Sequence, residues 1–189
     1  MARLHIPERD NTPPATKPIL DNVHGVLGFV PNLHRLMANS PNALAAWAAF
    51  QGNLAKTLDV KTRDGIALAV SEVNRCGYCL AAHSYVARNL AKIAPEEIAQ
   101  NRRGTSSDPK RAAAIHFAKE VIEMRGNVSD REIEAVKAAG WTDGEIVDIV
   151  ALSAQYSMTN MLNNVAGTHI DFPSDPTVER SEDLQGAQA

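Results

Sequence analysis

The chain has 189 residues, of which 44% are hydrophobic and 22% are charged, and its formal net charge is -3. This length and apolar content suffice for one globular unit with a real core, and the lack of basic character excludes the electrostatic footprint of a nucleic-acid-binding protein. No apolar run approaches the roughly 20 residues of a membrane span, and the first residues lack the apolar core of a secretory signal. We therefore expect a cytoplasmic protein with neither a membrane nor a nucleic acid as partner.

The residue pattern predicts an all-α fold. Aromatic residues make up only 5% of the chain, alanine is abundant, and apolar residues recur at spacings of three and four. We expect a proline-bearing extended arm over residues 1–18, a single helical domain over residues 19–173, and a polar flexible tail over residues 174–189. The domain is predicted to be a helical bundle.

Start and stop signals place the helices along the chain. Ser40 and Asp59 are predicted N-caps, and Ser129 and Thr142 each begin a capping box, a hydroxyl followed three residues later by a glutamate. Helices are predicted over residues 19–27, 41–56, 60–73, 76–91, 95–103 and 108–125, then from 129 and from 142 to about 167. The last of these contains a stretch around residues 153–164 that we expect to be easily kinked.

A weak internal echo links two parts of the chain. Residues 143–169 resemble residues 64–88, with an acidic start and an apolar helix followed by a second helix. In this alignment Ser157 and Asn160 stand roughly where two cysteines stand in the first copy. The echo suggests an internal duplication of a two-helix unit.

The two cysteines of the chain, Cys76 and Cys79, are separated by two residues, and His83 lies four positions beyond the second. On a helix, spacings of three, four and seven bring side chains to one face. A close cysteine pair in a cytosolic chain favours redox or metal chemistry over a static disulfide. The segment therefore predicts a dithiol with a base in reach.

The position of the pair favours a reactive thiolate. The first turn of a helix, or a nearby imidazolium, lowers a cysteine pKa from about 8.5 to somewhere between about 3.5 and 7.5. A thiolate that attacks a peroxide becomes a sulfenic acid, and a neighbouring thiol converts that acid to a disulfide. We expect Cys79, nearer to His83, to attack the peroxide and Cys76 to resolve the intermediate.

The histidine needs a carboxylate partner, and two are available on the preceding helix, Glu72 and Asp64. We favour Glu72, because its side chain is longer and lies near the helix junction. The alternative explanations are a solvated helix-end carboxylate for Glu72 and a first-turn residue complementing the helix dipole for Asp64.

These residues resemble the core motif of the alkylhydroperoxidase D and carboxymuconolactone decarboxylase-like family. The motif is Arg63-Asp64, Leu68-Ala69-Val70-Ser71 and Asn74-x-Cys76-x-Tyr78-Cys79-x-x-x-His83. Two further stretches are similar to the peroxidase-related branch of that family, Val30-Pro31-Asn32 and residues 165–173. The resemblance covers most of residues 19–173.

The resemblance implies a thiol peroxidase. In the family the second cysteine is peroxidatic, the first resolves and the histidine activates, which corresponds to Cys79, Cys76 and His83. The family's relay glutamate, twelve positions before the first cysteine, falls on Asp64. Some members carry a second histidine just before the peroxidatic cysteine, and here Tyr78 stands in that place.

Other functions use the same residues. Zinc would need a fourth ligand such as His116 or His169 beside the two cysteines and His83, and the cysteines could also be purely structural. A disulfide reductase or adaptor that passes electrons to another peroxidase, a carboxymuconolactone decarboxylase-type enzyme, and a non-catalytic interaction module are further alternatives. Our expectation is a peroxidase that uses no metal or cofactor and takes alkyl or hydrogen peroxide as substrate and an unidentified thiol or dithiol as reductant.

We also expect a homo-oligomer. An extended N-terminal arm and a loose tail are better explained by wrapping a neighbouring subunit than by exposure to solvent. The family resemblance implies trimers or hexamers.

Overall fold

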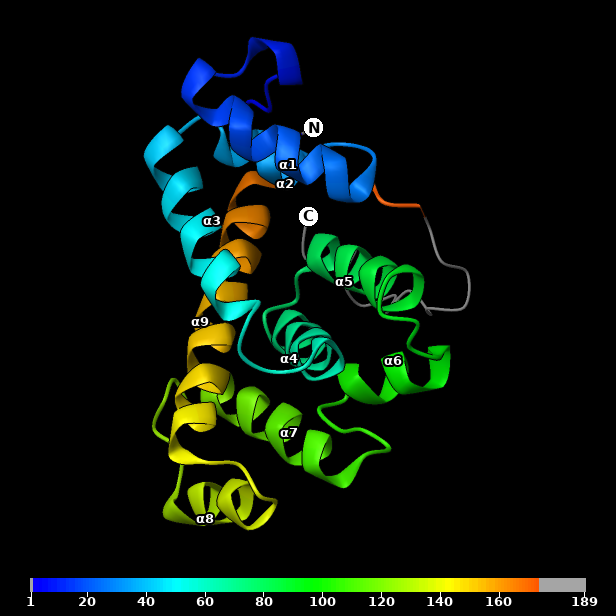
Figure 1. Ribbon diagram of the computed structural model, residues 1–189, viewed down its shortest axis with the longest axis vertical. Coiled ribbons are helices and arrows are strands. Elements are labelled where there is room, and N and C mark those ends of the chain that lie inside the picture. Colours follow the sequence, from blue (N-terminus) through cyan, green and yellow to red (C-terminus); the bar gives the residue numbers. More distant parts are fainter. Residues whose placement is uncertain (1, 174–189) are drawn as a thin grey trace.

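The computed structural model describes residues 2–173, so the predicted tail, residues 174–189, lies outside the described residues. The described part contains helices and no strand, which confirms the all-α prediction (Figure 1). The helices are α1 (Lys17–Leu27), α2 (Asn32–Met37), α3 (Pro41–Leu54), α4 (Val60–Val73), α5 (Gly77–Asn89), α6 (Pro95–Arg102), α7 (Pro109–Glu123), α8 (Asp130–Ala138) and α9 (Asp143–Ala166). No helix among residues 2–173 is long and apolar enough to cross a membrane.

Helix α4 lies at the centre of the bundle. It packs against α5, α6, α7 and α9, and every residue from Asp64 to Ser71 is buried. Gly65 allows the close approach of α7, because a Cβ atom at this position would overlap the side chain of Ile115. A helix that is buried on nearly all sides fixes the orientation of whatever follows its end, and α4 is followed directly by the two cysteines.

The capping signals are confirmed at the helix starts. The Asp59 carboxylate accepts from the backbone N–H groups of the first turn of α4, and Ser129 accepts from the Glu132 N–H at the start of α8. At the start of α9, Thr142 and Glu145 form both bonds of a capping box. Each cap provides an acceptor for N–H groups that a helix start leaves unpaired.

The structure differs from the sequence-based expectation in two helices. Helix α2, six residues long, was not predicted, because it spans less than two turns and its start lacks a side-chain cap. Helix α9 runs without a break from Asp143 to Ala166, whereas the chain divides into α4 and α5 in the first copy of the weak echo. The expected break in the second copy is therefore absent.

The N-terminal arm packs on its own chain. It contains two short 3-10 turns, Arg9–Asn11 and Pro14–Thr16. The Arg3 N–H donates to the Ala166 carbonyl at 2.6 Å, and the Asn39 amide donates to the His5 carbonyl at 2.8 Å. The arm is thus hydrogen-bonded to α9 and to the end of α2 in its own chain. These contacts do not support the expectation that the arm wraps a neighbouring subunit.

Candidate active site

The cysteines lie at the sharp junction between α4 and α5. Asn74 ends α4, Arg75 takes a left-handed conformation with φ of 50°, and Cys76 is the N-cap residue of α5. The Cys79 N–H donates to Cys76 Sγ at 3.3 Å. Both sulfurs therefore lie in the first turn of a helix, where the free N–H groups and the helix dipole favour negative charge.

The two sulfurs are in contact and unbonded. Cys76 Sγ donates to Cys79 Sγ at 2.6 Å, longer than the roughly 2.05 Å of a disulfide bond, and both cysteines are free thiols. The exposed fractions are 0% for Cys76 and 2% for Cys79. Closing a disulfide from this arrangement requires only a small approach of the two sulfurs.

Side chains of α9 distinguish the two sulfurs. The Asn163 amide donates to Cys79 Sγ at 3.2 Å, and Asn160 provides a second side-chain hydrogen bond. The hydrogen bond from Cys76, followed by those from the two asparagines, lowers the pKa of Cys79 even though burial opposes it. The pKa of Cys76 is raised by its hydrogen bond to Cys79 and by burial. Cys79 is thus favoured as the thiolate and Cys76 as the thiol.

A polar network holds the asparagines in place. Asn160 donates to Ser71 Oγ on α4 at 3.2 Å and accepts from the Asn74 amide at 2.9 Å. Asn74 also donates to Ser157 Oγ at 3.1 Å. These asparagines were not predicted as site residues. The only sequence signal was the weak echo that aligned Asn160 and Ser157 with the cysteines.

His83 lies on the same helix as Cys79 but has no hydrogen bond with it. Its ring packs edge-on against Tyr156 of α9, with ring centroids 5.2 Å apart. Burial lowers the pKa of His83 to about 4. The imidazole is therefore neutral at pH 7 and has a nitrogen available to take a proton.

The two candidate carboxylates have different surroundings. Asp64 is 7% exposed, and its Oδ2 atom is buried with no hydrogen-bond partner. Burial raises the pKa of Asp64 to about 7. Burial and then the charge of Asp64 raise the pKa of Tyr156, which places Asp64 near the ring that contacts His83. Glu72 is instead paired with Arg102 of α6, with Nε and Oε2 2.7 Å apart.

A C-terminal segment covers the dithiol. Tyr78 Oη donates to Asp171 at 2.9 Å and accepts from the Leu33 N–H at 3.1 Å. Asp171 also accepts from the Asn32 N–H at 2.7 Å, so three parts of the chain meet at this point. The Phe172 ring packs against aromatic rings on either side, those of Phe29, Tyr78 and Tyr85. Tyr78 therefore anchors this cover.

The residues required for a zinc site do not gather around the dithiol. His116, on α7, lies 3.4 Å from Glu132. Within residues 2–173 there is no group of three or more histidine, cysteine or acidic side chains that could hold a metal ion.

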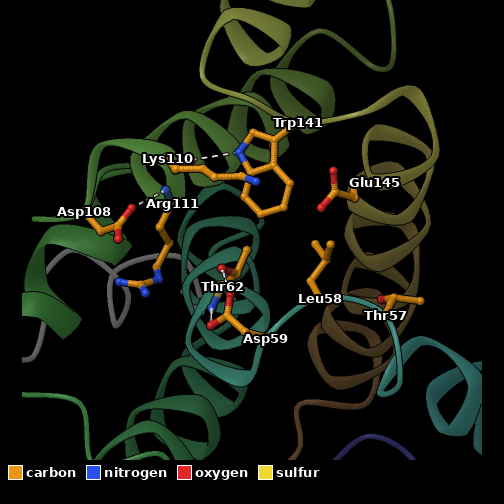
Figure 2. A pocket seen from close by; sticks show the side chains of 9 residues that line it. All are labelled: Thr57, Leu58, Asp59, Thr62, Asp108, Lys110, Arg111, Trp141 and Glu145. Carbon is orange, nitrogen blue, oxygen red and sulfur yellow. Dashed lines mark hydrogen bonds between the residues drawn. The ribbon is translucent and has the colours of Figure 1, made fainter.

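A cavity of about 260 Å³ lies at the opposite end of α4 from the dithiol (Figure 2). Three helix starts meet here, capped by Asp59, Asp108 and Thr142. Trp141 donates to the Lys110 carbonyl, and the Lys110 ammonium lies 4.4 Å from the Trp141 ring centroid. Because its acidic groups already cap their own helices, the cavity is explained as a junction of helix starts.

Comparison with known proteins identifies the region that contains the site. Residues 41–123, from the start of α3 to the end of α7, match the model of the carboxymuconolactone decarboxylase family. The central segment of the chain is therefore similar to this family. The match includes both cysteines, His83 and both candidate carboxylates, and it confirms the family resemblance seen in the sequence.

Solved structures share the fold over nearly the whole chain. An uncharacterized peroxidase-related protein from Ralstonia eutropha JMP134 with an alkylhydroperoxidase AhpD core is 27% identical, with a TM-score of 0.80 and coverage of 94% of each chain. A peroxidase-related protein from Silicibacter sp. TM1040 is 24% identical, with a TM-score of 0.78 over 95% of each chain. The debrominase Bmp8 in complex with 2,3,4-tribromopyrrole shares the fold at 18% identity and a TM-score of 0.74, over 90% of each chain. No curated protein matches the chain.

Proposed function

We propose that the protein is a thiol-dependent peroxidase in which Cys79 attacks an alkyl or hydrogen peroxide and Cys76 closes a disulfide. The observation that carries this proposal is the contact of two unequal sulfurs, 2.6 Å apart, with the lowered pKa on Cys79. A peroxidase needs one thiolate to attack and one thiol to resolve. The peroxidase-related structural neighbours agree with this chemistry.

In the proposed cycle the two cysteines react one after the other, and an external thiol then reduces them. The Cys79 thiolate attacks one peroxide oxygen, the O–O bond breaks, and the second oxygen leaves as an alkoxide or hydroxide that takes up a proton. The resulting Cys79 sulfenic acid is then attacked by the sulfur of Cys76, which forms the disulfide and releases water. An external thiol or dithiol reduces the disulfide and restores both thiols.

In this proposal neutral His83 accepts the Cys79 proton and returns it to the leaving oxygen, within hydrogen-bond reach directly or through one water. Asp64 is the proposed partner of His83, rather than Glu72, which the sequence favoured. Three observations support Asp64: its burial, its unpaired Oδ2 atom, and its closeness to Tyr156. Glu72 has Arg102 as its partner.

Burial of the dithiol favours a small substrate over a protein disulfide. Both sulfurs are covered by side chains, and a peroxide requires a smaller opening than the docking of another protein's disulfide. This observation favours the peroxidase over the adaptor. A free dithiol also persists best in a reducing compartment, which supports the cytoplasm as location.

Mixing the reduced protein with cumene hydroperoxide or hydrogen peroxide, followed by thiol counting, tests the proposal. We expect loss of both thiols for each peroxide consumed, with full recovery after reduction. If the thiols persist under excess peroxide, or if they react only with a disulfide substrate, the peroxidase proposal is wrong.

Asp64→Asn and Glu72→Gln separate the two carboxylates. We expect Asp64→Asn to slow oxidation of Cys79 at least tenfold and Glu72→Gln to leave the rate within about twofold of the wild type, in line with typical general acid–base contributions. The opposite outcome, a slow Glu72→Gln variant and an intact Asp64→Asn variant, would restore Glu72 to the relay.

A further inference from the structure

Asn74 joins the end of α4 to one face of α9. Its side-chain nitrogen donates to Ser157 Oγ at 3.1 Å and to Asn160 Oδ1 at 2.9 Å, and its backbone carbonyl accepts from the Asn164 side chain at 2.8 Å. The three partners are spaced by three and four residues and therefore lie on one side of α9. Two residues after Asn74, Cys76 begins the first turn of α5. Asn74 thus connects the junction that carries the dithiol to the helix that supplies its amide donors.

The side-chain amide of Asn160 is hydrogen-bonded at both its oxygen and its nitrogen. The oxygen accepts from Asn74, and the nitrogen donates to Ser71 Oγ at 3.2 Å. Asn160 also forms a side-chain hydrogen bond with Cys79. Because an amide nitrogen carries two hydrogens, it can donate to Ser71 and Cys79 at the same time. Asn160 is 0% exposed, so neighbouring side chains rather than solvent set the orientation of its amide.

The direction of the Asn160 amide decides whether it stabilises a thiolate at Cys79. With the nitrogen towards the sulfur, the amide donates to the negative charge, whereas a reversed amide would place its carbonyl oxygen against that charge. The Ser71 hydroxyl can donate or accept, so it fits either direction. The side-chain nitrogen of Asn74 can only donate, so it fits the oxygen of Asn160 and not the nitrogen.

We propose that Asn74 is a positioning residue, which donates to Asn160 Oδ1 and thereby holds the Asn160 nitrogen towards Cys79. Asn74 acts on the sulfur through Asn160. The inference rests on the proposed function in one respect, since it takes Cys79 as the attacking sulfur. The effect of Asn74 on the Cys79 thiol can be measured without any peroxide.

Thiolate absorbance during a pH titration of the reduced protein tests this role in single and double variants. We expect Asn160→Ala to raise the pKa of Cys79 by about one pH unit, which is about tenfold in the ionisation equilibrium. Asn74→Ala should raise it by about half a pH unit, because the Asn160 amide is then free to turn. Adding Asn74→Ala to Asn160→Ala should cause no further shift, because no amide remains for Asn74 to orient. A double variant whose shift equals the sum of the two single shifts overturns the proposal.

Ser157→Ala is the matched control, because it removes the other hydrogen bond of the Asn74 nitrogen and leaves Asn160 unchanged. We expect its titration curve to coincide with that of the wild type. If Ser157→Ala shifts the pKa of Cys79 as far as Asn74→Ala does, Asn74 only fastens α4 to α9, and the proposal is wrong. Circular dichroism of each variant checks that the helices are retained.

Asn74→Asp is a second variant, with nearly the shape of the wild-type side chain. A carboxylate can only accept, so it should turn the Asn160 amide over, and its charge adds to the effect on the thiolate. We expect alkylation of Cys79 by iodoacetamide at pH 7 to be slower in Asn74→Asp than in Asn74→Ala. In the Asn160→Ala background, Asn74→Asp should keep only the part due to its charge. An unchanged alkylation rate in Asn74→Asp contradicts the proposal.

The same variants separate this inference from the peroxidase proposal. If the shifts appear and peroxide still leaves both thiols intact, the role of Asn74 stands and the peroxidase proposal alone fails. If peroxide oxidises the dithiol and Asn74→Ala titrates like the wild type, the role of Asn74 alone fails.

Discussion

At the scale of single residues, the two sulfurs are made unequal by their hydrogen bonds. Cys79 accepts from Cys76 and from asparagines of α9, all of which stabilise its thiolate. Cys76 gives its own hydrogen to Cys79, and that bond, together with burial, favours its protonated form. The activation of Cys79 thus rests first on the Cys76 thiol and then on neutral amide donors, at the start of a helix.

Asn163→Ala should raise the pKa of Cys79 by about one pH unit, because a hydrogen bond to a charged acceptor contributes roughly 1.5–3 kcal/mol. The rate of peroxide attack at pH 7 should fall up to about tenfold and recover in alkali. Thiolate absorbance during a pH titration measures the change. Asn164→Ala is the control, because the neighbouring Asn164 side chain donates to the Asn74 carbonyl and not to a cysteine sulfur. Equal titration curves for both variants would remove Asn163 from the activation of Cys79.

Asp64→Asn should stabilise the protein, and more at pH 8 than at pH 5. The folded pKa of Asp64 is about 7, above the ordinary value of 3.8, so the folded state binds a proton between these values that the unfolded state has lost. Stability therefore falls as the pH rises through this window, and the fully ionised carboxylate is most costly above pH 7. Asparagine removes that cost. The difference between the two pH values should be on the order of 2 kcal/mol.

Urea unfolding of Asp64→Asn and the wild type at both pH values measures this effect. The combination expected here, greater stability with slower peroxide attack, is typical of a residue kept for function. A variant that is less stable than the wild type at pH 8 would show that the Asp64 carboxylate is held by contacts that favour its charge.

At the scale of helices, local signals could be predicted and long-range contacts could not. Caps such as Asp59 and Thr142 act within three or four residues, so the starts of α4 and α9 were visible in the sequence. The pairing of Cys79 with Asn163 joins positions 84 residues apart, and no spacing rule relates them. For the same reason the sequence could place Cys76, Cys79 and His83 on one helix. It could not decide which carboxylate of the preceding helix is the partner of the histidine.

The crossing of α4 and α7 depends on a glycine. A Cβ at Gly65 would overlap Ile115, which is fully buried. Gly65→Ala should therefore destabilise the protein by roughly 1–3 kcal/mol, despite the higher helix propensity of alanine. Ile115→Val alone should cost about 0.5–1.5 kcal/mol.

The double variant Gly65→Ala with Ile115→Val provides the control for this prediction. Because valine lacks the Cδ1 atom that the new methyl group would meet, the double variant should lose less stability than the sum of the single changes. Urea denaturation of the four proteins measures the coupling. Strict additivity would mean that the two positions do not compete for the same space.

At the scale of the whole molecule, the dithiol belongs to a core built from both ends of the described chain. Its cluster combines residues of α1, α2 and α3 with Phe172, while a separate cluster joins α4, α7, α8 and α9. Helix α9 connects the two clusters, since Ile149 and Leu152 belong to the second one and Asn163 donates to Cys79 in the first.

The central claim is that Cys79 attacks the peroxide and Cys76 resolves the product. Trapping with a sulfenic-acid reagent, followed by mass spectrometry of peptides, tests it directly in Cys76→Ser and Cys79→Ser after one equivalent of cumene hydroperoxide. We predict a label on Cys79 in Cys76→Ser and no label in Cys79→Ser. A label on Cys76 in Cys79→Ser, with an inert Cys76→Ser, would reverse the roles, and the absence of label in both variants would contradict the peroxidase mechanism.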